Sequence, residues 1–275
     1  MLRRVIRLIA CLVSLLLPTA VLVPASHAAE SDPVNLRVLS YNIHHGAGPD
    51  DVLDLRHVMK VVAGSRADVV ALQEVDNHWS ARSAFADQTR WLAKELGMHA
   101  VYGANLDLDP LEPGQERRQY GTAILSRYPI QEWSNTLLPR FGTHEQRGLL
   151  VADLSVEGVP VRVANTHLQH DDALERQAQA ARIVELLGSG PERTFLTGDL
   201  NATPDAPEIG TLTDVFADTW AVAGAGDGYT YPVEAPHARI DYVLASPDAA
   251  VRDVRVLAAD ASDHLPYLAE VSVRR

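Results

Sequence analysis

The sequence predicts an α/β fold in which two β-sheets pack together and helices lie on the outside. Three observations support this prediction. Segments with apolar residues at helical spacing alternate with short apolar runs that are typical of strands. Most of the expected strands come in groups, so that they can pair into sheets around one core. The 275 residues are 47% hydrophobic, which is enough for one large core and favours a single domain.

The first half of the chain alternates strands and helices. Strands are predicted at residues 35–41, 69–72 and 99–103. Helices are predicted at residues 52–62 and 85–96. We expect Asp50 or Asp51 to cap the first helix. Gly64 and Gly97 are expected to end the two helices, and residues 105–119 to form a charged surface loop near the functional site.

The second half begins with four consecutive, mostly antiparallel strands. They are predicted at residues 120–126, 132–138, 149–156 and 159–166. A long helix then begins after a cap formed by Asp171 or Asp172 and ends at Gly188. Its expected buried stripe consists of Leu174, Ala178, Ala181, Val184 and Leu187. The remaining expected elements are a buried strand ending near Leu196, a short helix at 207–212, a loop at 222–236 and strands at 239–245, 251–258 and 266–273.

Residues 1–28 have the layout of a secretory signal peptide. Three arginines give a basic start, residues 8–23 are almost wholly apolar, and small residues precede an expected cut near Ala28. The alternative is an uncleaved membrane anchor, but the prolines and the small residues at the end of the segment favour cleavage. We therefore predict a secreted, extracellular protein whose catalytic domain spans residues 29–275.

Cysteine content and charge limit the possible chemistry. The only cysteine, Cys11, lies in the predicted signal peptide, so the mature protein would have no disulfide and no thiol for catalysis or zinc binding. The net charge is -12 at pH 7, and it would fall to about -15 after the loss of the three N-terminal arginines. A strongly acidic protein is a poor general binder of phosphate backbones, although bound metal would offset part of this charge.

Polar side chains recur at the edges of the predicted strands. Six apolar runs each meet one of them: Asn42, Glu74, His167, Asp199, Asp241 and Asp263. Strand ends in α/β proteins crowd into one crevice where ligands bind. Gly198 lets the backbone turn, so that Asp199 and Asn201 point the same way. A carboxylate and an amide placed in this way can orient a water and bind a phosphoryl oxygen. The alternative is that Asp199 and Asn201 are ordinary turn residues.

Seven short blocks follow one another after residue 34. They are Ser40–His44, Leu72–Asp76, Tyr120–Arg127, Asn165–Leu168, Gly198–Pro204, Arg239–Val243 and Ser262–Pro266. In this order they resemble the endonuclease/exonuclease/phosphatase superfamily, the DNase I-like metal-dependent phosphoesterases, and most of all its secreted bacterial hydrolases. The resemblance implies a four-layer α/β sandwich of two packed mixed sheets flanked by helices. It also implies a phosphoric ester hydrolase that uses a divalent metal.

The resemblance implies that Asn42, Glu74 and Asp263 bind Mg²⁺ or Mn²⁺. Ligand sets rich in oxygen suit these ions, which keep several of their waters. For Glu74 the alternative is a solvated residue at the end of a strand.

The resemblance also assigns catalytic roles. Asp199 would orient or deprotonate the attacking water, and Asn201 would contact the phosphate. His264, oriented by Asp241, would hold a phosphoryl oxygen as negative charge develops. His167 would act as an acid at the leaving oxygen. The alternatives are a turn residue for Asp199 and a structural histidine–aspartate pair for His264.

Four further residues are candidates for substrate contact. Tyr120 matches a phosphate-contacting tyrosine of several relatives, although a core aromatic would fit the same strand position. His44 lies where relatives vary, and we expect it to tune substrate choice. Arg127 and Arg147 are candidates for phosphate binding, with a surface ion pair as the alternative. Five histidines without a motif are expected at the surface: His45, His57, His78, His170 and His237.

The predicted activity is hydrolysis of a phosphodiester, whose source is a lipid headgroup, a nucleic acid or a small diester. A nuclease would need a basic crevice rim, which several arginines supply in part but the net charge opposes. A sphingomyelinase-like enzyme would expose apolar rim residues, for which Trp79, Leu106, Leu108 and Leu111 are candidates. A non-catalytic binding module is disfavoured because such proteins usually lose site residues. No stable protein partner is implied, and we expect a monomer.

Overall fold

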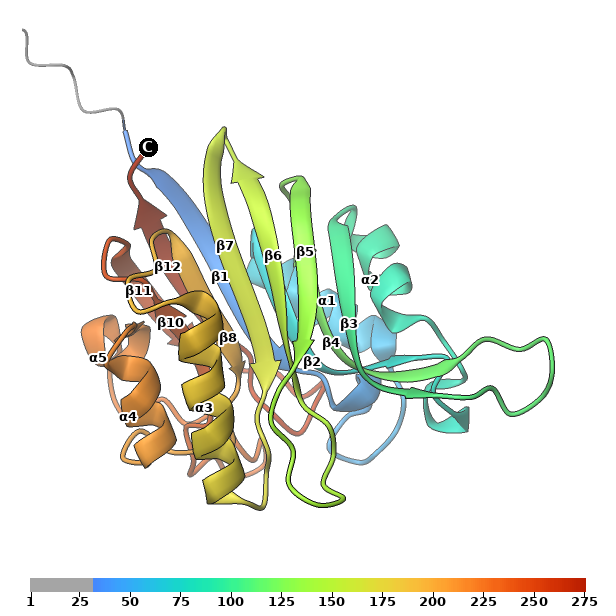
Figure 1. Cartoon of the computed structure of the whole chain (residues 1–275). Helices are drawn as coiled ribbons and strands as arrows, with labels where there is room; N and C mark the ends of the chain where they lie inside the picture. Colours follow the sequence, from blue (N-terminus) through green and yellow to red (C-terminus); the bar gives the residue numbers. More distant parts are fainter. Residues whose placement is uncertain (1–31) are drawn as a thin grey trace, which may run out of the picture. The chain divides into compact units, whose positions relative to one another are not determined.

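Two six-stranded β-sheets pack against each other in residues 32–275, the part of the chain that this computed structural model describes (Figure 1). The first sheet holds, in spatial order, β11 (Ala250–Val256), β12 (Tyr267–Val273), β1 (Val34–Asn42), β2 (Val69–Asn77), β4 (Arg118–Ser126) and β3 (His99–Leu108). The second holds β5 (Ile130–Leu137), β6 (Gly148–Val156), β7 (Val159–His167), β8 (Thr194–Asp199), β10 (Asp241–Ala245) and β9 (Ala217–Asp218). The predicted signal peptide, residues 1–28, lies outside the described residues.

Each sheet is mixed, and its parallel pair lies near its centre. In the first sheet β1 runs parallel to β2, and in the second β7 runs parallel to β8. The other neighbouring strands pair antiparallel. The parallel strands end in polar residues, so the carboxyl ends of four strands from two sheets bring catalytic candidates to one edge.

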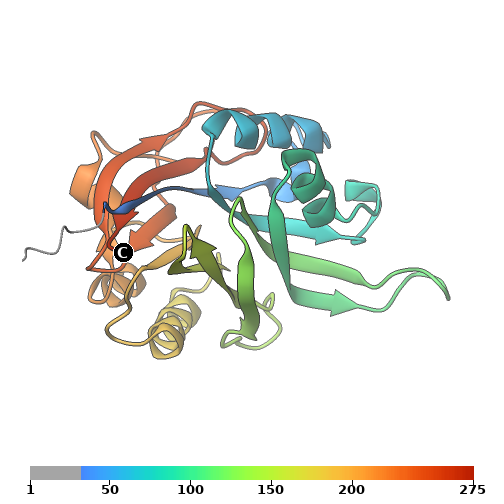
Figure 2. The same ribbon diagram turned by 90° about the horizontal axis from the view of Figure 1, so that it is seen from above.

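Helices cover the outer face of each sheet (Figure 2). They are α1 (Leu55–Ser65), α2 (Gln88–Leu96), α3 (Ala173–Leu187) and α4 (Pro207–Thr213), whereas Trp220 and Ala223 of α5 (Thr219–Ala223) pack against the core between the sheets. Short 3-10 turns lie at His44–Gly46 and Ala81–Ser83. Val38 and Phe195 belong to the core between the sheets, whereas Val58 of α1 and Ile183 of α3 belong to separate outer cores. A fully buried side chain of this size contributes roughly 1.5–3 kcal/mol. The predicted four-layer sandwich is confirmed.

The predicted boundaries of α1 were wrong at both ends. Asp54 caps the helix, accepting a hydrogen bond from the His57 backbone N–H at 3.0 Å, and Asp51 lies in the preceding turn. Gly64 lies inside the helix, which ends at Arg66 in the left-handed conformation. A residue other than glycine can thus end a helix when the following chain holds it there.

The boundaries of α3 agree with the prediction, and Val184 and Leu187 of the expected stripe are partly buried against the outer core, but the fully buried residues are different ones. Asp172 caps the helix and Gly188 follows its end. The buried residues are Glu175, Gln179, Ala180 and Ile183, whereas Leu174 of the expected stripe is 69% exposed. The helix turns this polar face inward because Glu175 and Gln179 hydrogen-bond to the loop before β6.

Two predicted loops contain regular structure. β3 and β4 extend as a hairpin to Leu108 and Arg118, so only the tip of the expected 105–119 loop is irregular. The helix α5 overlaps the start of the expected 222–236 loop. The four strands expected to be consecutive are divided between the sheets, since the chain passes from β4 in the first sheet to β5 in the second. Among residues 32–275, no helix is both long and apolar enough to cross a bilayer.

Candidate active site

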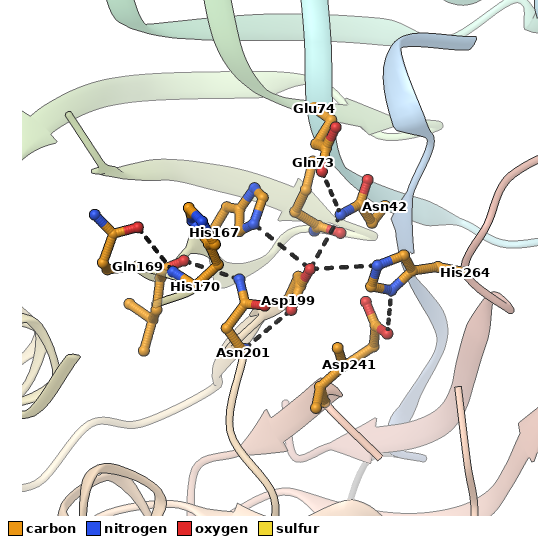
Figure 3. Close-up of polar contacts among 12 residues, drawn as sticks. Asn42, Gln73, Glu74, His167, Gln169, His170, Asp199, Asn201, Asp241 and His264 are labelled. Carbon is orange, nitrogen blue, oxygen red and sulfur yellow. Dashed lines mark hydrogen bonds and ion pairs between the residues drawn. The ribbon is translucent and has the colours of Figure 1, made fainter. Parts of the chain in front are cut away.

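Polar side chains from both sheets meet at the carboxyl ends of the parallel strands (Figure 3). Asn42 ends β1 and reaches across to both sheets. Its Nδ2 donates to Glu74 Oε1 and to Asp199 Oδ2, at 3.0 Å in each case. A single buried amide therefore joins a carboxylate of β2 to the Asp199 carboxylate of β8, which lies 157 positions after Asn42 in the sequence.

Glu74 and Asp199 reach this point through local departures from regular strand geometry. The pairing of β2 with β4 shifts between Leu72 and Val75, and Glu74 adopts a φ of 57° at this bulge. Before Asp199, a Cβ on Gly198 would lie 2.2 Å from the Thr166 carbonyl oxygen, so only glycine allows this approach of β8 to β7.

Asp199 lies at the centre of the cluster. Its Oδ1 accepts from the Asn201 backbone N–H at 3.0 Å, while Oδ2 lies 3.5 Å from His167 Nε2 and 3.6 Å from His264 Nε2. Burial raises the pKa of Asp199 to about 7, although the His264 charge and the Asn42 hydrogen bond oppose the shift. The carboxylate can therefore gain or lose a proton near neutral pH.

His264 is held by Asp241, as the resemblance implies. Its Nδ1 lies 2.8 Å from Asp241 Oδ2, and both side chains are buried. Burial disfavours the charged ring, but the charges of Asp241 and Asp199 outweigh it and raise the pKa of His264 to about 10. The ring is therefore positively charged at neutral pH, which suits a group that meets a phosphoryl oxygen.

Asp263 lies beside the same cluster. The Ser262 hydroxyl contacts both the Asn42 carbonyl oxygen at 2.8 Å and Asp263 Oδ1 at 3.2 Å. The ring of Tyr231 packs on His264 with centroids 4.7 Å apart. Burial, followed by the charges of Asp263 and Asp199, raises the pKa of Tyr231, and Glu74 adds to this effect. Asp263, Asp199 and Glu74 are therefore all near enough to the Tyr231 phenol for their charges to act on it.

The residues expected to bind metal fit a hard divalent cation. Asn42, Glu74 and Asp263 provide amide and carboxylate oxygens, which Mg²⁺ and Mn²⁺ prefer. The fit also rests on charge, because several carboxylates converge here around the single charged imidazole of His264. A cation at this point would compensate the excess of negative charge.

His167 lies on the side of Asp199 away from His264 (Figure 3), and Arg147 is near enough for its charge to act on His167. Arg147 forms an ion pair, as its alternative expected, with Nη1 donating to Glu145 Oε1 at 2.6 Å, but the guanidinium is buried and not at the surface. Its Nε is buried and has no hydrogen-bond partner among the described residues. Burial, followed by the charge of Arg147, lowers the pKa of His167 well below its usual value. His167 is therefore neutral at pH 7, which is unfavourable for the predicted acid.

Tyr120 lies near the end of β4 that is closest to the site, whereas Arg127 follows the other end. Tyr120 is 8% exposed and lies 5.8 Å, between ring centroids, from Trp79. Burial, and after it the charge of Glu74, raises the pKa of the Tyr120 phenol well above its usual value, so the phenol keeps its proton.

Arg127 donates to the Ala67 carbonyl oxygen at 3.0 Å, before the start of β2. It lies at the opposite end of the strands, and its predicted phosphate contact is wrong.

His44 lies in the turn after β1, where its backbone N–H donates to Asn42 Oδ1 at 3.1 Å. The neighbouring His45 is 6% exposed, so its predicted surface position is wrong. His57, His78, His170 and His237 are partly or fully exposed.

Three features were missed by the sequence reasoning. Gln73 and Asn165 form a buried hydrogen bond of 2.7 Å between the sheets, although both lie within recognised blocks. Glu175 anchors the loop that carries Arg147, and the Asp-x-x-Glu pattern at the start of α3 was a local signal for it. Tyr231 lies in a segment without a pattern that would have marked it.

Comparison with known proteins places this site in context. A sequence profile of the endonuclease/exonuclease/phosphatase family matches residues 39–264. The uncharacterized protein YbhP of Escherichia coli K12 is 27% identical over 274 residues, covering 88% of this chain and 98% of YbhP. A 5'-tyrosyl-DNA phosphodiesterase of Caenorhabditis briggsae is 25% identical, covering 74% of this chain and 57% of that protein. The structure of a Bacteroides thetaiotaomicron mannosyl-6-phosphatase shares the fold, with a TM-score of 0.69, 19% identity, and coverage of 86% of this chain and 99% of that chain.

Proposed function

Because the chain belongs to the endonuclease/exonuclease/phosphatase family of phosphoester hydrolases, we propose that it hydrolyses phosphodiesters with the help of a divalent cation. The observation that carries this proposal is the position of Asp199 between Asn42, His167 and His264. A carboxylate with a pKa near neutrality is suited to orient a water and accept its proton.

The attacking water would lie against Asp199, whose second oxygen is held by the Asn201 backbone N–H. Charged His264 would meet a phosphoryl oxygen as negative charge increases during the displacement. When bound by Asn42, Glu74 and Asp263, the cation supplies positive charge to the phosphoryl group.

The leaving oxygen would be approached from the side of His167. Since this ring is neutral, it would donate a hydrogen bond through an N–H rather than deliver a proton as an imidazolium. The protonated phenol of Tyr120 is a second donor of the same kind. Arg147, whose Nε has no hydrogen-bond partner among residues 32–275, would be a further donor to a phosphoryl oxygen that reached it.

Charge at the site favours a diester over a monoester. Carboxylates outnumber the cationic side chains around Asp199, so a diester with one negative charge meets less repulsion than a monoester with two. The Caenorhabditis relative is a phosphodiesterase by name and the Bacteroides protein a phosphatase, so the family accommodates both ester classes. The basic and apolar start of the chain supports the proposal that the protein is secreted.

A lipid diester is the second candidate, and exposed leucines favour it. Leu108 is 41% exposed and Leu111 is 59% exposed on the β3–β4 hairpin, which projects beyond the edge of its sheet (Figure 1). A nuclease gains less support, because Arg117 is paired with Asp107 and Asp109 rather than free for a phosphate backbone.

The test is a substrate panel on the chain without its first 28 residues. Bis-p-nitrophenyl phosphate, p-nitrophenyl phosphate, sphingomyelin vesicles and plasmid DNA are compared in Mg²⁺ and in EDTA. We expect diester turnover that EDTA abolishes and that Asp199→Asn lowers by about 10²–10⁴-fold. Asp153→Asn, which changes a half-exposed ion pair on β6, is the matched control and should leave the rate unchanged. Full turnover by Asp199→Asn, or a rate insensitive to EDTA, would exclude the proposed mechanism.

A further inference from the structure

Two adjacent histidines follow β1 in an unusual backbone conformation. His44 and His45 have φ values of 43° and 46°, in the left-handed region that residues other than glycine rarely adopt. Their rings meet edge to face with centroids 4.5 Å apart, so the imidazoles converge instead of stacking. The turn therefore presents two nitrogen ligands from consecutive positions.

A carboxylate completes the group. One ring nitrogen from each of His44 and His45 and one carboxylate oxygen of Glu74 all lie within 4.8 Å of one another. Glu74 is also in the left-handed region, at the bulge of β2. Three ligand atoms, two from the turn after β1 and one from the bulge of β2, thus lie close enough together to bind one ion.

The histidines retain unused ligand atoms. Nδ1 of His44 and Nδ1 of His45 are both buried and have no hydrogen-bond partner among residues 32–275. His45 is 6% exposed, and burying an unpaired ring nitrogen is unfavourable unless something binds it. Its other ring nitrogen, Nε2, lies 3.6 Å from Asp51 Oδ1. Metal-binding histidines commonly have their second nitrogen beside a carboxylate in this way.

We propose that His44, His45 and Glu74 bind a second divalent cation of the zinc class. Two imidazoles and one carboxylate form a ligand set that zinc accepts with a fourth position open to water or substrate. Mg²⁺ prefers oxygen ligands, so the two histidines distinguish this ion from the one held by Asn42, Glu74 and Asp263. The inference rests on the proposed function only through Glu74, which both ions share.

Other groups of possible ligands are weaker candidates. In the group of His144, Asp172 and Glu175, Asp172 caps α3 and Glu175 already accepts hydrogen bonds from the Phe141 backbone N–H and from His144. The group around Asp199 belongs to the site described above.

The experiment measures zinc binding directly. The untagged chain is titrated with Zn²⁺ in excess Mg²⁺, against a chromophoric chelator, with His44→Asn and His45→Asn as test variants. Asparagine tolerates the left-handed backbone, so the turn is preserved. His57→Asn is the control, because His57 lies on α1 with its Nε2 near exposed Asp260 and outside the group. Urea unfolding and circular dichroism verify that each variant is folded.

We expect one Zn²⁺ per chain in the wild type, with affinity at least about tenfold weaker in His44→Asn and in His45→Asn. His57→Asn and His264→Asn should bind as the wild type does. The proposal is overturned if the wild type binds no zinc in excess Mg²⁺, if both test variants keep wild-type affinity, or if His264→Asn alone loses the ion.

Diester hydrolysis, measured in parallel, separates this proposal from the proposed function. If the wild type binds zinc but Asp199→Asn hydrolyses the diester at the wild-type rate, the proposed zinc site stands and the proposed mechanism is rejected. Absence of zinc binding together with Asp199-dependent hydrolysis would reject the zinc site alone.

Discussion

At the scale of single residues, two buried histidines beside Asp199 differ in charge because their neighbours differ. His264 has Asp241 on its Nδ1, and the nearby carboxylates overcome burial and raise its pKa to about 10. His167 is also buried but lies near Arg147, and its pKa is lowered. One ring is therefore charged and the other neutral at pH 7, so they suit different tasks on one substrate.

The role of Asp241 as a positioning residue can be tested by Asp241→Asn. The asparagine keeps the shape but removes the charge, so the pKa of His264 should fall and its ring should lose positive charge as pH approaches neutrality. We expect kcat for a diester to fall by about 10²-fold, with the pH–rate profile shifted to lower pH. Histidine titration by NMR checks the pKa. An unchanged His264 titration with an unchanged kcat would contradict this role.

At the scale of elements, the polar face of α3 fixes the loop that carries Arg147. Glu175 Oε2 accepts from the Phe141 backbone N–H at 2.9 Å and lies 2.7 Å from His144 Nδ1. Gln179 Nε2 donates to the Pro139 carbonyl oxygen at 3.0 Å. These hydrogen bonds satisfy polar groups that the helix buries, and they connect a helix on the outer face to a side chain in the site.

The His144–Glu175 pair predicts a pH dependence of stability. The hydrogen bond to Glu175, opposed by burial, raises the pKa of His144 above its usual value of 6.5. The stabilisation is thus fully present below the unfolded-state pKa of about 6.5, and it is lost as pH rises through the higher folded-state pKa. In urea unfolding, the wild type should exceed His144→Gln in stability most at acidic pH, and the difference should shrink toward alkaline pH. A difference that grows with pH would contradict the assignment.

At the scale of the whole described body, a buried polar contact joins the two sheets beneath the site. Asn165 on β7 accepts from Gln73 Nε2 at 2.7 Å, and its own Nδ2 donates to the carbonyl oxygens of Leu72 and Ala123 at 2.8 and 2.9 Å. Gln73 precedes Glu74, and Asn165 lies two positions before His167 on the same strand. The contact therefore aligns candidate catalytic residues of one sheet with those of the other.

Asn165→Ala should weaken both stability and activity. The variant removes the Asn165 side chain from two buried carbonyl oxygens and takes away the shortest of the three hydrogen bonds of the Gln73 amide, which costs roughly 3 kcal/mol of unfolding free energy. Urea unfolding measures this loss, and kcat for a diester should fall because β2 and β7 lose their alignment. Thr203→Ala, which removes an exposed hydrogen bond to Asp205, is the control with an expected change within about 0.5 kcal/mol. An Asn165→Ala variant as stable and active as this control would refute the role.

The sequence alone determined the features that depend on neighbouring residues. Apolar periodicity located most of the helices and strands of the described residues, but not α5 or β9. Asp172 and Gly97 delimit their helices as predicted, because caps act within a turn. The order of the blocks indicated the family and, through it, the side chains that converge at the strand ends. Among residues 32–275, these signals were local or came from recognised motifs.

Tertiary structure decided which faces are buried and which charges meet. Leu174 is exposed while Glu175 is buried, because the loop before β6 supplies partners for a carboxylate and none for a leucine. Arg147 and Arg127 both looked like phosphate ligands, but antiparallel pairing places Arg127 at the far end of β4. His45 is buried by a turn whose backbone conformation no local pattern predicts. Burial and charge pairing depend on residues distant in sequence, so they become defined only when both sheets are assembled.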